Sequence, residues 1–293
     1  MRSEKEMLDL ILRVAKEDNR IRAVYMNGSR TNSHVPKDIF QDYDVVYVVE
    51  ETASFIEENT WINVFGELLM IQEPDRNDQF IGREVDLSQS YGYLMLFTDG
   101  NRIDLRIQTL GEMIKDYGSD SLTVPLLDKD GVLPIIPQAS DEGYHVRRPS
   151  IKQYLSNCNN FWWCLQNVAK GIWRDELPYS KQMFELVIRS ELHQMVDWWI
   201  GSQHDFKISP GKFGKYYKKH LPKRFWEMYK KTYCDSEYDH MWESLFTACE
   251  LFRILAVDVG EELGVEYPYI EDKNMMMYLE GVRNLPKDAT DIY

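Results

Sequence analysis

The stretch that decides the fold is "NGSRTNSHVPKDIFQDYDVVYVV", from Asn27 to Val49. It opens with a turn of small residues, crosses a polar segment and ends in a nearly continuous apolar run, which predicts a strand covered on both faces. Asp42 and Asp44 stand two positions apart at the start of this strand. Since side chains at that spacing point to one face, the two carboxylates lie together, and Tyr43 faces the other way.

A third carboxylate stands in the segment "YLMLFTDGNRIDLRI", in which two β-type runs flank Asp99-Gly100 and predict a hairpin. In its second run, Arg102, Asp104 and Arg106 alternate with apolar residues, so Asp104 lies on the polar face. If this strand pairs with the 43–49 strand, three carboxylates converge. Magnesium prefers such oxygen ligands, and a carboxylate trio can hold two metal ions about 3.5–4 Å apart for phosphoryl or nucleotidyl transfer.

The turn "GSR" fits the same chemistry. Gly28 permits close approach of the backbone to a ligand, and Ser29 offers a hydroxyl and an N–H to phosphate oxygens. Arg30 is a candidate for charge-assisted bonds to phosphate, although a surface role is equally compatible with its position. Each element alone is common, and the combination carries the prediction of a nucleotide-binding site.

The remaining pattern predicts an α+β protein. Its first part has a mixed β-sheet flanked by helices, and its second part is an all-α helical bundle. The boundary lies near a connection rich in Asp, Gly and Pro at 128–149, which predicts domains at 1–145 and 146–293. Within the first part, the predicted segments are a helix at 3–18, strands at 21–26 and 43–49, a helix at 54–68 and a loop at 73–88.

Composition narrows the possible partners. The net charge of −14 argues against nucleic acid, which needs a basic surface. Residues 1–145 hold 14 Lys and Arg against 27 Asp and Glu, so nearly all of the acidic surplus lies there. It serves solubility or attracts a cationic small molecule. The basic run 207–224 is interpreted as a solvated helix and loop rather than a nucleic-acid patch.

Other features predict a cytoplasmic protein that does not enter the membrane. No apolar run is long enough to span a bilayer, and the N-terminal "MRSEKEMLDL" lacks the apolar core of a signal peptide. The four cysteines have no metal-type spacing and are expected to be reduced. The six histidines show no zinc-type pairing.

The order of these elements resembles the nucleotidyltransferase superfamily that includes DNA polymerase β. That signature is a Gly-Ser turn, then Asp-x-Asp, then a carboxylate on a later strand. Nearly the whole chain is also similar to the aminoglycoside 6-adenylyltransferases, which inactivate streptomycin. The segments that carry this similarity include "IRAVYMNGSRTN", "FQDYDVVYVV", "DGNRIDL", "LLDKDG", "VAKGIWRDEL" and "MWESLFTACELFR".

The resemblance implies a magnesium-dependent enzyme that moves AMP from ATP to the 6-hydroxyl of streptidine and releases pyrophosphate. Asp42 and Asp44 would hold magnesium, and Ser29 with nearby amides would grip the phosphates. Asp104 would bind a second metal ion or accept the proton of the attacking hydroxyl, and these two roles stay open. Such an enzyme would act in the cytoplasm as a monomer or homodimer, with a nucleotidyltransferase domain at 1–145 and an acceptor- and nucleotide-closing domain at 146–293.

Lys170 resembles a family lysine that faces the nucleotide, with an ordinary solvated helix lysine as the alternative. Asp175 and Glu176 are weaker candidates for binding the cationic acceptor. Arg106, on the predicted site face, is expected either to pair with Asp104 or to contact a phosphate. The aromatic clusters at 161–163 and 197–201 are interpreted mainly as core. The rival functions are transfer to a different small-molecule or protein hydroxyl, and a nucleotide-binding protein without turnover.

Overall fold

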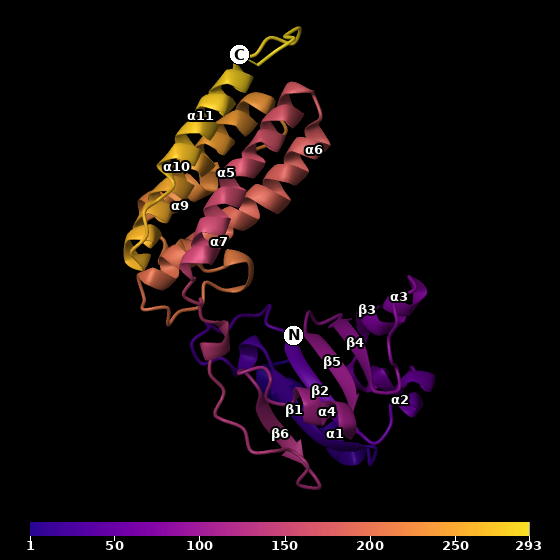
Figure 1. Ribbon diagram of the computed structural model, residues 1–293. Coiled ribbons are helices and arrows are strands. Elements are labelled where there is room, and N and C mark those ends of the chain that lie inside the picture. The colour runs from indigo at the N-terminus through magenta and orange to yellow at the C-terminus, as the bar shows by residue number, and fades with distance from the viewer. Residues whose placement is uncertain (293) are drawn as a thin grey trace. The chain divides into compact units, whose positions relative to one another are not determined.

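The structure, a computed structural model, describes residues 1–292. The chain forms two compact units, the first from Met1 to Gly143 and the second from Tyr144 onward. A β-sheet with helices makes up the first unit, and helices make up the second (Figure 1). The predicted α+β fold, with a mixed sheet in the N-terminal half and a helical C-terminal half, is confirmed.

The sheet of the first unit has six strands in the order β3-β4-β5-β2-β1-β6. Strand β2 runs parallel to β5, whereas every other neighbouring pair is antiparallel. The predicted hairpin is therefore the β4–β5 pair, and its second strand does lie beside the strand that follows Asp42. The strands are β1 (Ile21–Asn27), β2 (Tyr43–Val49), β3 (Leu68–Gln72), β4 (Ser90–Phe97), β5 (Arg102–Thr109) and β6 (Val124–Asp128).

Helices cover both faces of this sheet. Helix α1 (Glu4–Glu17) begins at a capping box in which Ser3 and Glu6 satisfy each other's backbone N–H groups. Its apolar side packs on one sheet face together with Tyr43 and the alternate residues of β2 that follow it. Helix α4 (Leu110–Asp116) places Met113 against the other face, which carries Val46 and Val48. Asp44 belongs to this second face because it alternates with Tyr43.

Two predictions in this unit are wrong. The segment 54–68 is not one helix: α2 (Ala53–Glu57) is followed by a 3₁₀ turn (Trp61–Phe65), and Gly66, at φ +131°, leads into β3. The segment 73–88 is not all loop, because it contains α3 (Pro74–Phe80). Pro74 starts this helix, where a missing N–H is tolerated.

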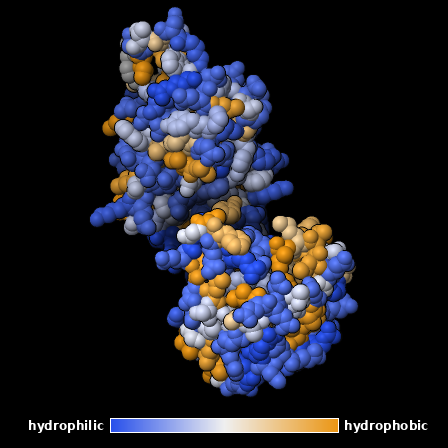
Figure 2. Space-filling model, turned by 90° about the vertical axis from the view of Figure 1, so that its right-hand side faces the viewer, coloured by the Kyte–Doolittle hydropathy of each residue, from blue (hydrophilic) through white to orange (hydrophobic). Residues whose placement is uncertain are grey.

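The edge strand β3 and helix α3 leave large apolar side chains in solvent, and hydrophobic surface is visible on this unit in Figure 2. The strand therefore lacks the alternation of buried and polar residues that would have identified it in the sequence. The exposed side chains are Leu69, Met70, Ile71, Phe80 and Ile81.

The second unit is a bundle around two long helices. Helix α5 (Ile151–Trp173) starts at a capping box of Ser150 and Gln153, and α10 (Tyr238–Leu263) ends at Gly264 in the left-handed conformation. The others are α6 (Leu177–Gln182), which continues through a π-helical turn (Met183–Ile188) into α7 (Arg189–Ser202), and then α8 (Tyr217–His220), α9 (Lys223–Lys231) and α11 (Tyr269–Arg283).

Aromatic rings fill the core of this bundle. The ring of Phe161 stacks on that of Phe252 with centroids 3.8 Å apart, and Trp162 donates its indole N–H to the Tyr267 hydroxyl at 3.0 Å. The expectation that the aromatic cluster at 161–163 is core is confirmed for two of its members and wrong for Trp163, which is 65% exposed. All four cysteines are free.

No helix in the described part of the chain is both long and apolar enough to cross a membrane.

Candidate active site

Three carboxylates converge near the starts of the two central strands of the sheet, β2 and β5, which lie side by side (Figure 1). In their parallel register, Asp44 lies directly opposite Asp104. Asp42 precedes β2 by one residue and shares the face of Asp44. One oxygen from each carboxylate lies within 4.8 Å of the others. The structure thus brings together the three residues that the sequence selected.

This cluster is electrostatically strained. Burial, followed by the charges of Asp42 and Asp104, raises the pKa of Asp44 to about 7 from its ordinary value near 4. The Arg102 guanidinium opposes this shift, though not enough to cancel it. Asp44 thus combines a partly buried position with two neighbouring carboxylates, and both disfavour its charged form.

Gly28 lies against the cluster for a steric reason. It has φ +78°, a conformation that favours glycine, and a Cβ built on it would stand 2.1 Å from Oδ2 of Asp44. The turn that follows is a short 3₁₀ segment, Ser29–Thr31. Only a glycine at position 28 therefore lets the Gly-Ser turn and the carboxylate lie side by side.

Ser29 lies in the same corner. Gln41 donates its side-chain amide to the carbonyl and the hydroxyl oxygen of Ser29, both at 3.5 Å. The Oε1 atom of Gln41 is buried without a hydrogen-bond partner among the described residues. Thr31 ties the turn to a neighbouring loop by donating its hydroxyl to the carbonyls of Gly28 and Leu122. The long contacts of Ser29 leave its hydroxyl easy to exchange for another partner.

Arg30 is engaged within the protein. It donates to the backbone carbonyls of Asp42 at 2.8 Å and Gln41 at 2.6 Å, and its guanidinium lies 3.7 Å from the centre of the Tyr43 ring. Its side chain is only 6% exposed. In this arrangement Arg30 fixes the backbone that carries the first carboxylate, a role that the sequence did not suggest.

Arg102 is the site residue that sequence reasoning missed. It donates to both oxygens of Asp104, with Nε at 2.7 Å from Oδ1, and its Nη1 lies 3.8 Å from Asp42. Of the two alternatives predicted for Arg106, pairing with Asp104 is wrong, because Arg106 donates to Ser90 at 2.8 Å, and contact with a phosphate stays a prediction. The signal was available, because Arg102 also stands two residues from Asp104.

The other predicted residues belong to the second unit. Lys170 lies in the last turn of α5 and is half-buried. Asp175 and Glu176 are exposed just beyond that helix, where Asp175 adopts φ +61° and accepts the Tyr238 hydroxyl at 2.9 Å.

The carboxylate cluster fits a divalent metal ion. Its donors are all carboxylate oxygens, the ligand type that magnesium prefers. Burial and then the charges of Asp42 and Asp104 raise the pKa of Asp44, and a bound cation would offset the effect of these charges. Among the described residues, the Arg102 guanidinium is the cationic group that pairs with this trio, so the site can accommodate added positive charge.

Comparisons with known proteins identify the family of this chain. The family model described as streptomycin adenylyltransferase matches residues 1–282. An aminoglycoside 6-adenylyltransferase from Campylobacter jejuni is 38% identical over 93% of this chain and 93% of its own. One from Bacillus subtilis (strain 168) is 37% identical over 96% of this chain and 98% of its own. One from Staphylococcus aureus is 33% identical over 96% of this chain and 99% of its own.

A crystal structure of an aminoglycoside 6-adenyltransferase from Bacillus subtilis is 33% identical, covers 97% of this chain and 100% of its own, and gives a TM-score of 0.48. The family match spans nearly the whole chain, and three relatives exceed 30% identity over almost their full length. The chain therefore belongs to the streptomycin adenylyltransferase family and is a nucleotidyltransferase.

Proposed function

We propose that this enzyme transfers AMP from ATP to an aminoglycoside hydroxyl, specifically the 6-hydroxyl of streptidine in streptomycin. The hydroxyl oxygen forms a bond to the α-phosphorus, the bond from that phosphorus to the bridging oxygen breaks, and pyrophosphate leaves. The observation that carries this proposal is the trio Asp42, Asp44 and Asp104 beside the Gly-Ser turn, in a chain of this family. We expect the reaction to occur in the cytoplasm, where ATP is available.

Asp42, Asp44 and Asp104 would hold magnesium. When bound, the metal would offset phosphate charge and lower the pKa of the acceptor hydroxyl. Arg30 keeps Asp42 in place through its backbone carbonyl, and Gly28 keeps the approach to Asp44 open. The protein's own contribution is thus to hold like charges together before any ligand arrives.

Asp104 has two candidate roles, as a metal ligand and as the base that accepts the hydroxyl proton. Arg102 occupies both of its oxygens, so either role requires one of these contacts to open. The freed guanidinium would then lie where it can pair with a phosphate oxygen, since guanidinium binds phosphate in a planar, bidentate manner.

Other residues would bind the two substrates. Ser29 would exchange its long contacts with Gln41 for a phosphate oxygen. Lys170 would add positive charge for the triphosphate, with residues 146–293 closing over the nucleotide. Asp175 and Glu176 would face the cationic acceptor, which the acidic surplus of residues 1–145 would also attract.

The test is pyrophosphate release from the purified protein with ATP and magnesium, with and without streptomycin, and with the product mass recorded. Kanamycin and spectinomycin are run in parallel. Streptomycin-dependent release with a product heavier by one AMP supports both the chemistry and the acceptor. Release that occurs with kanamycin or spectinomycin but not with streptomycin would contradict streptomycin as the acceptor. If none of the three aminoglycosides causes release, the proposal of an aminoglycoside acceptor is contradicted.

A further inference from the structure

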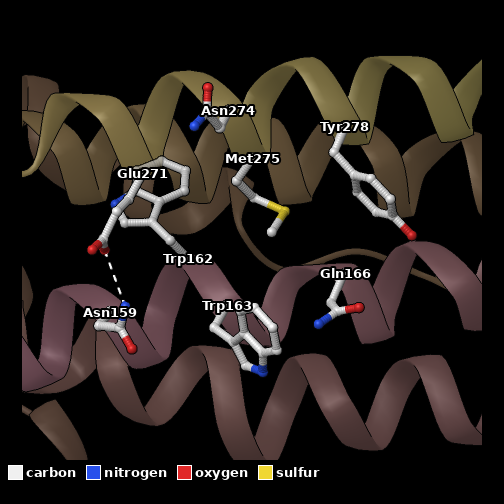
Figure 3. A pocket seen from close by; sticks show the side chains of 8 residues that line it. All are labelled: Asn159, Trp162, Trp163, Gln166, Glu271, Asn274, Met275 and Tyr278. Atoms are coloured by element: carbon white, nitrogen blue, oxygen red, sulfur yellow. Dashed lines mark hydrogen bonds between the residues drawn. The ribbon is translucent and has the colours of Figure 1, made fainter. Parts of the chain in front are cut away.

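A separate pocket of about 450 Å³ lies in the helical unit between α5 and α11 (Figure 3). Each helix lines it with residues one turn apart, so two rows of side chains face each other. Trp163 lies on the α5 side, and Met275 and Tyr278 lie on the α11 side. An indole that is 65% exposed in a bundle whose other aromatics are mostly buried indicates a surface built for contact.

The polar groups of this pocket are one carboxylate and several neutral amides. Glu271 is the one charged side chain among the residues that line it, and it accepts a hydrogen bond from the Asn159 amide at 3.2 Å. Gln166 and Asn274 add two further amides, each with an acceptor oxygen and a donor NH2 group. With no lysine or arginine in the lining, the pocket presents an aromatic face next to a carboxylate.

A guanidinium next to one of the lining aromatics is already compensated. Arg253 lies 5.8 Å from the centre of the Trp162 ring and pairs with both oxygens of Asp272. Its charge therefore does not neutralise Glu271. The pair also demonstrates, within the same helix bundle, that an indole ring here accepts a guanidinium over its face.

The chemistry of the lining selects the ligand class. A phosphate or carboxylate ligand would meet Glu271 and repel it. An uncharged apolar ligand would cover Trp163 and displace water from the Glu271 carboxylate without supplying a donor in its place, which costs free energy. A planar cation satisfies both requirements, because its face stacks on the indole and its N–H groups point outward in the ring plane.

We propose that the α5–α11 pocket binds a planar organic cation of the guanidinium type through Trp163 and Glu271. The identity of the ligand rests on the proposed function: streptidine carries two guanidinium groups, so the pocket is a binding site for the acceptor. The location of the site rests on the pocket alone.

The experiment is calorimetric titration of the full chain with streptomycin in the absence of ATP and magnesium. Trp163→Leu removes the π face and keeps an apolar side chain, so we expect binding to weaken roughly tenfold. Trp163→Phe keeps an aromatic face and should stay within about threefold of the parent. Glu271→Gln removes the charge but keeps an acceptor for Asn159, and we expect roughly fivefold weaker binding.

Two controls make this titration specific. Glu280→Gln removes an exposed carboxylate from the same helix outside the pocket and should leave binding unchanged. Kanamycin, which carries ammonium groups without guanidinium, should bind more weakly and show no dependence on Trp163. Because Trp163 and Glu271 are exposed, all variants should melt at the parental temperature.

Unchanged streptomycin affinity in both Trp163→Leu and Glu271→Gln overturns the proposed pocket, as does a parent protein that does not bind streptomycin. AMP transfer is measured separately. If streptomycin binding depends on Trp163 but no AMP transfer occurs, the proposed function is contradicted and the pocket is supported. If AMP transfer occurs but both variants bind streptomycin like the parent, the pocket is contradicted and the proposed function is supported.

Discussion

Two carboxylates in the two units of this molecule show how differently a protein can treat a negative charge. Asp272 in the helical unit is 4% exposed, and Arg253 and the Tyr267 hydroxyl both donate to it. Asp44 in the sheet unit has a more accessible surface, and burial, followed by the charges of Asp42 and Asp104, raises the pKa of its carboxyl to about 7. The two carboxylates differ more in whether neighbouring groups compensate their negative charge than in their exposure to solvent.

The difference indicates where to look for function. A carboxylate whose partners are all supplied by the chain contributes to the structure of the fold. A carboxylate placed among like charges weakens the fold and is compensated when a ligand supplies positive charge. Four experiments break or sharpen this comparison.

The largest effect is expected from Asp44→Asn. This substitution removes a charge from the metal-binding trio, so turnover should fall by at least about 10³-fold, while circular dichroism stays parental. The measurement is pyrophosphate release with ATP, magnesium and acceptor. Asp38→Asn, in an exposed segment, is the matched control and should keep full activity. Activity of Asp44→Asn within a few-fold of the parent would remove the metal-ligand assignment.

Arg253→Met tests the other side of the comparison. It leaves Asp272 buried without its cation, which should lower the free energy of unfolding by about 3 kcal/mol in urea denaturation. Adding Asp272→Leu removes the stranded charge and should recover most of this loss. If the double variant is as unstable as the single one, packing rather than charge compensation explains the role of the pair.

The pH dependence of stability should report Asp44 in metal-free protein. The pKa of its carboxyl is about 7 in the folded state and near 4 when unfolded, so between these values the folded state binds more protons. The stability that the protonated Asp44 carboxyl contributes at low pH is therefore lost as the pH rises through this window. The free energy of unfolding of Asp44→Asn should exceed that of the parent by roughly 2 kcal/mol at pH 8 and by much less at pH 4.

Urea denaturation with a chelator at these two pH values measures the difference. If Asp44→Asn is more stable than the parent by the same free energy at both pH values, the effect does not arise from titration of the Asp44 carboxyl.

The smallest effect is expected from Arg102→Gln. Removing the guanidinium leaves the trio more negative and frees Asp104, so magnesium should bind several-fold more tightly in titrations at pH 8.5. Arg106→Gln, which alters an arginine bonded to Ser90, is the control and should change magnesium affinity less. Weaker magnesium binding in Arg102→Gln would mean that Arg102 organises the trio instead of competing for it.

Local patterns predicted the elements that position the site. The apolar run 43–49 and the Asp99-Gly100 hairpin correspond to β2 and to the β4–β5 pair. The spacing of Asp42 and Asp44 fixed their common face, since alternation in a strand is a local property. What local pattern could not give is an edge strand such as β3, whose side chains are mostly exposed and lack a buried face to mark them.

That Arg106 does not pair with Asp104 has a physical cause of the same kind. Arg102 and Arg106 flank Asp104 symmetrically in the sequence, and only the tertiary structure distinguishes them. Arg106 lies opposite Gly92, whose N–H donates to Asp75 on α3, and its guanidinium reaches within 4.0 Å of that carboxylate. Because α3 was expected to be loop, the acidic partner of Arg106 was not placed.

The contacts of Arg30 have a consequence for how this protein can vary. Its guanidinium joins the Gly-Ser turn to the backbone of Gln41 and Asp42, so the two ends of the intervening segment are fastened together. The chain between them, at 33–40, is mostly exposed. Closing a longer loop over fixed ends adds little free energy, so insertions there should be tolerated without displacing the carboxylates.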